Sequence, residues 1–186
     1  MGKGRDGALG LDRAYVEIGN ICNLACSFCP GTRRPPRQMT EEEFSRVCAA
    51  LAPHTDSIFL HVMGEPLLHG SLDRFLTVAA EHGFRVSVTT NGTLLDERGE
   101  ILLGHAGTVR KVSVSLHSME GNGAEAIGAY LDAAIAFAER AAAVGIYTVF
   151  RLWNLDADGR SGENRENAAI EAHLKRHFGE IGRAHV

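Results

Sequence analysis

Five short runs of apolar and β-branched residues recur along the 186-residue chain, and segments with helical periodicity separate them. Strands that alternate with helices in this way form a parallel sheet, because each crossover helix returns the chain to the same end of the sheet. The sequence therefore predicts an α/β fold with five βα units. The expected strands are Ala14–Ile18, Ser57–Val62, Arg85–Thr89, Lys111–Leu116 and Ile146–Leu152.

Helix boundaries are marked by residues that cap helices. Thr40 followed by Glu43 is a capping box, which predicts a helix that begins after Thr40. Gly83 and Gly145 each follow an apolar periodic segment, where a helix often ends in a left-handed glycine. The other expected helices are Leu72–His82, Leu94–Leu103, Ala126–Val144 and Asn164–Phe178.

Three cysteines follow the first expected strand, at Cys22, Cys26 and Cys29, in the spacing CxxxCxxC. Thiolates favour iron–sulfur clusters and zinc. Three ligands are one fewer than a cubane cluster needs, so one iron would stay open for another molecule. A zinc site with His54 or His61 as fourth ligand is the alternative, although no second cysteine pair follows. A disulfide framework does not suit three clustered thiols, and three buried apolar cysteines would not explain their grouping.

Other unusual segments also fall directly after the expected strands. They are Met63–His69, Thr90–Thr93, Ser115–Ser118 and Arg151–Asn154. In parallel α/β folds, ligands bind at the carboxyl ends of the strands. The sequence therefore predicts one binding site at this edge, shared with the cysteines.

The cysteine segment resembles that of the radical S-adenosylmethionine (SAM) enzymes, in which an aromatic residue, here Phe28, precedes the last cysteine. The resemblance implies that Cys22, Cys26 and Cys29 hold a [4Fe–4S] cluster whose fourth iron binds SAM. It implies reductive cleavage of SAM to a 5′-deoxyadenosyl radical, which abstracts hydrogen from a substrate. It further implies a partial (β/α) barrel of six βα units, about five of which this chain contains.

The same resemblance suggests residues that contact SAM. Gly64, Glu65 and Pro66 are similar to the family's GGEP segment, except that Met63 replaces the first glycine. Asn91 belongs to a TNG segment, and Ser115 matches a position that contacts SAM. A strand-exit turn and a serine on a polar strand face would explain the same residues. Arg151 is expected to pair with the carboxylate of SAM through its guanidinium fork, and its alternative is a solvated arginine.

Several remaining residues have plainer interpretations. Cys48 lies on the apolar face of the first expected helix and is expected in the core. His61 and His117 are expected either in contact with substrate or satisfied in the core. The basic run Arg33, Arg34 and Arg37 suits a solvated loop, a phosphate contact or an acidic redox partner.

Composition limits the class of protein. The net charge of −4 and the 45% apolar content suit one globular domain, and make nucleic-acid binding an unlikely function. No apolar stretch approaches the length of a membrane span, and no secretory signal is present, which predicts a cytoplasmic protein. We expect a flexible tail at 1–13 and a truncated core at 14–180. Residues 181–186 match a translated sequencing adapter and are expected to be an artefact.

Three functions fit these observations. A radical SAM enzyme would need a low-potential electron donor of the flavodoxin or ferredoxin type and an unidentified substrate, with a peptide or protein as one class. A non-catalytic iron–sulfur electron carrier would hold a cluster without binding SAM. A zinc-stabilised binding domain would hold one metal ion and no sulfide.

Overall fold

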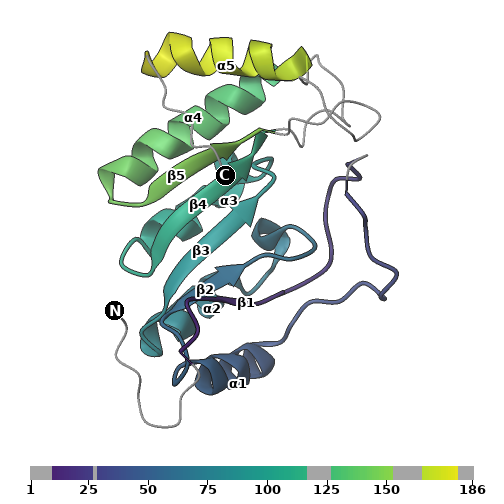
Figure 1. Ribbon diagram of the computed structural model, residues 1–186, viewed down its shortest axis with the longest axis vertical. Helices are drawn as coiled ribbons and strands as arrows, with labels where there is room; N and C mark the ends of the chain where they lie inside the picture. Colours follow the sequence, from purple (N-terminus) through teal and green to yellow (C-terminus); the bar gives the residue numbers. More distant parts are fainter. Residues whose placement is uncertain (1–9, 27–28, 117–126, 153–164, 180–186) are drawn as a thin grey trace.

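The computed structural model describes residues 10–26, 29–116, 127–152 and 165–179. All five expected strands are present, and they form one parallel sheet in the order β1-β2-β3-β4-β5. The alternation of strands and helices predicted this parallel sheet, which is open, as in the partial barrel that the resemblance implied (Figure 1). The strands are β1 (Ala14–Tyr15), β2 (Ser57–Leu60), β3 (Arg85–Thr90), β4 (Val109–Ser115) and β5 (Tyr147–Arg151).

In the part of the chain that the structure describes, five α-helices and one 3₁₀ helix connect or follow the strands. The 3₁₀ helix η1 lies where the Gly-Glu-Pro segment leaves β2, which places Pro66 at its first position. The helices are α1 (Glu41–Leu51), η1 (Pro66–Leu68), α2 (Leu72–Glu81), α3 (Leu95–Gly104), α4 (Ile127–Ala143) and α5 (Arg165–Phe178). Within the described residues, no helix is long and apolar enough to cross a membrane.

The capping predictions are confirmed. The Thr40 hydroxyl accepts a hydrogen bond from the Glu43 backbone N–H, and the Glu43 carboxylate accepts one from the Thr40 N–H. Gly83 has a φ of 74° and Gly145 a φ of 81°, which are left-handed conformations suited to glycine. In both cases the N–H of the following residue bonds back to the last turn of the helix, which ends it before the next strand.

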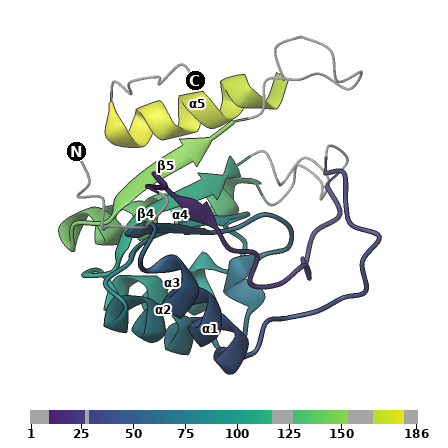
Figure 2. The ribbon, with the colours of Figure 1, turned by 60° about the horizontal axis from the view of Figure 1, so that its bottom comes forward.

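The core lies between the sheet and the helices. Alternate residues along the strands, such as Ile58, Leu60 and Val112, are completely buried. They share one core with helix residues such as Phe75 and Leu102. Figure 2 shows α1, α2 and α3 gathered on one side of the sheet. Because side chains alternate along a strand, the residues between these buried positions point to the other face of the sheet.

The first expected strand is shorter in the structure than in the prediction. β1 is paired over only two residues and not five, although the Val16 N–H still donates to the Phe59 carbonyl at 2.9 Å. Of the expected tail at 1–13, residues 10–13 are described, and the Leu11 N–H donates to the His54 carbonyl at 2.9 Å. Residues 181–186 lie outside the described residues.

Candidate functional site

The cysteine loop, which we define as residues 20–37, is closed at its base by backbone contacts. Gly19 and Gln38 form an isolated antiparallel bridge, and the Asn20 N–H donates to the Arg37 carbonyl at 3.1 Å. The Asn20 side chain adds two bonds: its oxygen accepts from the Arg37 N–H at 2.7 Å, and its nitrogen donates to the Pro35 carbonyl at 2.9 Å. The base of the loop is therefore fixed, and the loop extends past the strand ends (Figure 1).

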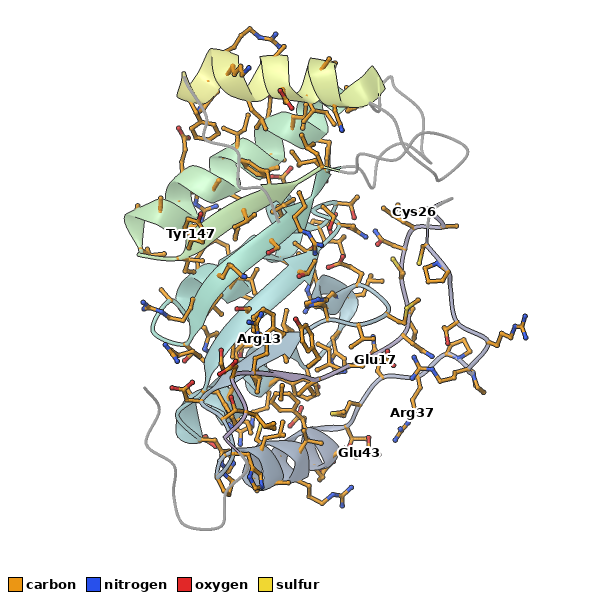
Figure 3. All side chains as sticks on the ribbon, viewed as in Figure 1. Arg13, Glu17, Cys26, Arg37, Glu43 and Tyr147 are labelled. Carbon is orange, nitrogen blue, oxygen red and sulfur yellow. The ribbon has the colours of Figure 1, made fainter. Side chains whose placement is uncertain are left out.

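The three cysteines occupy this loop as free thiols. Cys22 and Cys29 are exposed and Cys26 is partly buried. The Cys29 N–H donates to the Cys26 carbonyl at 3.0 Å, which turns the chain between the second and third cysteine. Figure 3 shows Cys26 beyond the edge of the sheet. Phe28, which the resemblance places against the cluster or the adenine of SAM, lies outside the described residues. Within the described part, no three acidic, histidine or cysteine side chains meet around one metal ion.

A ring of three polar side chains joins the cysteine loop to the end of β3. The Asn91 amide nitrogen donates to the Asn23 oxygen at 2.8 Å, and the Asn23 amide donates to the Thr93 hydroxyl at 2.8 Å. The Thr93 hydroxyl in turn donates to the Asn91 oxygen at 2.7 Å. The Asn91 amide nitrogen also lies 3.8 Å from the Cys22 sulfur. The predicted convergence of the cysteines with the TNG segment is therefore present as direct contacts.

Gly64 joins the end of β2 to the same loop. Its φ is 79°, and a Cβ at this position would lie 2.7 Å from the Gly19 oxygen and 2.8 Å from the Ile21 oxygen. The next residue continues this contact, because the Glu65 N–H donates to the Ile21 carbonyl at 2.8 Å. Only glycine permits both the conformation and the close approach of the two backbones. This close packing is a role for Gly64 that the sequence prediction, a contact with SAM, did not include.

Glu65 is a buried carboxylate with three donors. One oxygen accepts from the Leu67 N–H at 3.0 Å and from the Thr90 hydroxyl at 2.7 Å, and the other accepts from the Asn91 N–H at 2.7 Å. The side chain is 5% exposed, and burial raises the pKa of the carboxyl although the three donors act in the opposite direction. Glu65 thus connects the exit of β2 to the exit of β3.

Tyr130 completes this arrangement from α4, and the sequence analysis did not identify it. Its hydroxyl donates to the Asn91 carbonyl at 2.7 Å and lies 3.3 Å from the Ser115 carbonyl. Burial raises the pKa of Tyr130, with smaller contributions from Glu65 and Cys26. A buried tyrosine needs a hydrogen-bond partner, so its place on the apolar face of the helix was the available signal. We call Glu65, Thr90, Asn91 and Tyr130 the strand-end framework.

Three other predicted residues lie at this edge of the sheet. Ser115 and Arg151 are the last residues of β4 and β5, and the register pairs them directly. The Ser115 side chain is half-buried, and Arg151 is exposed. Pro66 is buried in η1, directly after Glu65. The described parts of all five segments that follow the strands therefore lie at one edge of the sheet, as predicted.

The plainer interpretations can be compared in the same way. Cys48 is 1% exposed within the core, as predicted, and burial raises the pKa of its thiol to about 11. Two arginines of the basic run form ion pairs: Arg34 with Glu17 at 2.6 Å, and Arg37 with Glu43. Figure 3 labels Glu17, Arg37 and Glu43 beside the base of the loop. His117 lies outside the described residues.

Comparison with protein families gives a decisive match. The family described as the radical SAM superfamily matches residues 16–159, which is most of the chain. The chain belongs to the radical SAM superfamily. The match begins directly after β1 and includes the cysteine loop and strands β2 to β5. The family that the sequence resembled is therefore confirmed.

Individual relatives of this radical SAM chain include enzymes with different names. A GTP 3′,8-cyclase of Stenotrophomonas maltophilia is 38% identical over 112 residues, covering 56% of this chain and 33% of that protein. The sporulation killing factor maturation protein SkfB of Bacillus subtilis is 30% identical over 107 residues, covering 56% of this chain and 26% of that protein. The chain thus spans about a third of the length of the curated relatives it matches.

A solved structure shows the same fold. The crystal structure of BtrN in complex with AdoMet and 2-DOIA superimposes with a TM-score of 0.55 at 24% identity, covering 76% of this chain and 56% of BtrN. At this level of identity the likeness supports the architecture alone. It confirms the prediction of a partial barrel made of parallel βα units.

The residues of the loop suit the group that the superfamily implies. Three soft thiolate ligands lie on one loop, while the fourth cysteine of the chain, Cys48, is buried in the core and separate from them. The Asn91 amide near the Cys22 sulfur offers a hydrogen bond of the kind that surrounds cluster ligands. Cys22, Cys26 and Cys29 would therefore be the ligands of a [4Fe–4S] cluster.

Proposed function

We propose that the whole protein is a radical SAM enzyme, in which Cys22, Cys26 and Cys29 hold a [4Fe–4S] cluster. The supporting observation is the position of the three free thiols, on a loop that Asn23, Asn91 and Thr93 attach to the strand-end edge. When bound, the cluster and SAM supply a 5′-deoxyadenosyl radical, which abstracts hydrogen from the substrate. The protein binds and orients both groups.

The strand-end edge offers groups for each charged part of SAM. A carboxylate has about four acceptor positions, and Glu65 uses three, so one remains for the SAM ammonium group. Arg151 supplies a guanidinium for the SAM carboxylate, with the Ser115 hydroxyl on the neighbouring strand. Phe28, Gly64, Pro66 and Asn91 complete the proposed set of SAM contacts.

The reaction needs two further participants, which we also propose. One is a low-potential electron donor of the flavodoxin or ferredoxin type. The other is a substrate, and the likeness to the SkfB maturation protein supports a peptide or protein. The proposed compartment is the cytoplasm, where thiols stay reduced.

The cofactor assignment can be tested by anaerobic reconstitution of the chain with iron and sulfide. We expect about four iron and about four sulfide per chain. The variant Cys22→Ala should lose both. Bound zinc without sulfide would contradict the proposal and favour the zinc-stabilised domain.

The SAM contacts can be tested separately by equilibrium dialysis of the loaded chain with SAM. Arg151→Ala should weaken SAM binding at least tenfold, because a charge-assisted pair contributes roughly 1.5–3 kcal/mol. Arg74→Ala, on the exposed surface of α2, is the matched control and should bind SAM like the wild type. Equal affinities of the two variants would remove Arg151 from the site.

A further inference from the structure

The face of the sheet that the helices leave uncovered carries a row of aromatic and polar side chains. Strand register places Tyr15 beside Phe59, Phe59 beside Ser87, and Ser87 beside Lys111. A register shift in β4 produces this order, because Val86 pairs with Val109 while Ser87 pairs with Lys111. The extra residue in β4 changes which of its side chains point to this face, so that Lys111 lies beside Ser87.

Two cations of this face lie against one aromatic ring. The Lys111 ammonium is 5.2 Å from the centre of the Phe59 ring, and the Arg13 guanidinium carbon is 5.6 Å from it. In Figure 3, Arg13 is labelled near β1 and Tyr147 near β5, the two edge strands of the sheet. Among the described residues, no carboxylate forms an ion pair with Lys111 or Arg13. Glu17, two residues after Tyr15, is already paired with Arg34.

His61 follows Phe59 on the same face and has an unused polar atom. Its ring contacts Tyr15 edge-on, with 5.3 Å between ring centres. Its Nδ1 is buried and makes no hydrogen bond within the described part of the chain. Burial lowers the pKa of His61, and the charges of Arg151 and Lys111 lower it further. His61 therefore lies in a positive field, and its buried nitrogen has no hydrogen-bond partner in the described part of the chain.

We propose that this face binds an anionic group of the substrate, a carboxylate or a phosphate, between His61 and Lys111. An anion beside the half-buried His61 ring would balance the two cations over Phe59. The chain as a whole has a net charge of −4, so the cations on this face are not part of a generally positive surface. A neutral substrate would leave these groups without a partner.

The position of the face relative to the strand ends limits the shape of the substrate. Lys111 precedes Ser115 by four positions on β4, which corresponds to about 13 Å along a strand. The proposed SAM contacts lie at the Ser115 end. His61 directly follows β2 and lies nearer this edge than Lys111 does. The substrate therefore carries its charge within about 13 Å of its reacting carbon. This assignment to the substrate rests on the proposed function, whereas anion binding itself does not.

The test uses the cluster-free chain and two probes, inorganic phosphate and succinate, at constant ionic strength. The His61 ring signal, assigned by its loss in His61→Gln, is followed by nuclear magnetic resonance during each titration. We expect a saturable shift for at least one probe, and the tighter probe identifies the phosphate or the carboxylate as the preferred anion. Lys111→Met and Arg13→Met should each weaken binding at least fivefold, because they keep the apolar stem but remove the charge.

The matched control is Arg74→Met, which removes one positive charge on α2 and should bind the probes like the wild type. Absence of saturation with both probes would overturn the proposal. Equal affinities of Lys111→Met, Arg13→Met and Arg74→Met would also overturn it, since the two cations would then only pack on Phe59. If the chain loads a cluster and binds SAM but gives neither signal, the anion site fails and the proposed function stands. If the chain binds anions but loads no cluster, the proposed function fails and the anion site stands.

Discussion

The strand-end framework and the cysteine loop lie against each other but are stabilised differently. The framework is buried, and its polar groups satisfy one another: Glu65 accepts three hydrogen bonds, and Tyr130 donates to the Asn91 carbonyl. The loop is mostly exposed beyond its base, and two of its three cysteines are exposed. The difference indicates that the protein forms the framework by itself, whereas the thiols are available to a ligand. Changes in the framework should therefore reduce stability, and changes in the cysteines should reduce iron content.

The largest loss of stability is expected for Glu65→Ala. The change leaves the Leu67 and Asn91 N–H groups and the Thr90 hydroxyl without their acceptor. Each buried donor without a partner costs about 1–3 kcal/mol, so the free energy of unfolding should fall by about 4 kcal/mol. Urea denaturation measures this change. Glu97→Ala, at an exposed position in the first turn of α3, is the control and should cost less than about 1 kcal/mol.

A smaller loss is expected for Gly64→Ala. The left-handed conformation and the contact with the Gly19 and Ile21 carbonyls should together cost about 3 kcal/mol. Because the contact joins β2 to the loop base, iron loading should fall as well. Gly70→Ala has no atom within 4 Å of the new Cβ, and it should keep wild-type stability. If both variants unfold at the same urea concentration, the close packing described for Gly64 is wrong.

Removal of one hydroxyl from the framework should have a moderate effect. Tyr130→Phe keeps the ring but loses the hydrogen bond to the Asn91 carbonyl and the weaker contact with the Ser115 carbonyl. The free energy of unfolding should fall by about 1 kcal/mol, the typical contribution of one hydrogen bond. Thermal denaturation followed by circular dichroism can detect this. An unchanged midpoint would show that water replaces the hydroxyl at no cost.

The smallest effect on stability is expected within the cysteine loop. Cys29→Ser changes an exposed side chain and should alter the free energy of unfolding by less than about 0.5 kcal/mol, while iron content after reconstitution falls sharply. Cys48→Ser is the matched control, and we expect it to show the opposite pattern. It places a hydroxyl in the core, so it should cost roughly 1–3 kcal/mol but leave the iron content of the folded protein unchanged. The reverse pattern would contradict the division between framework and loop.

The sequence predicted the order of elements better than the contacts between them. Period-two runs and capping residues located all five strands and the start of α1, because these signals depend on neighbours in sequence. The alignment of motifs at one sheet edge also followed, since parallel strands share their carboxyl ends. The sequence did not predict that Glu65 accepts hydrogen bonds from the end of β3, or that Tyr130 donates to the Asn91 carbonyl. Both contacts join segments that are distant in the sequence.

The length of β1 was overestimated for a similar reason. Val16 and Ile18 are buried like strand residues, but after Tyr15 the chain leaves the ladder toward the loop base. The apolar pattern reflects burial, whereas the length of the strand is set by where its pairing with β2 stops. The pairing of Arg34 with Glu17 was likewise invisible, because the loop returns to β1 only in three dimensions.

The most direct test of the account is low-temperature electron paramagnetic resonance of the anaerobically reconstituted and reduced chain, recorded with and without SAM. The account predicts a [4Fe–4S]⁺ signal that shifts when SAM is added, because three cysteines leave one iron open to it. The shift should be lost in Cys22→Ala along with the signal itself. A cluster signal that SAM does not change would contradict the account and favour the electron carrier.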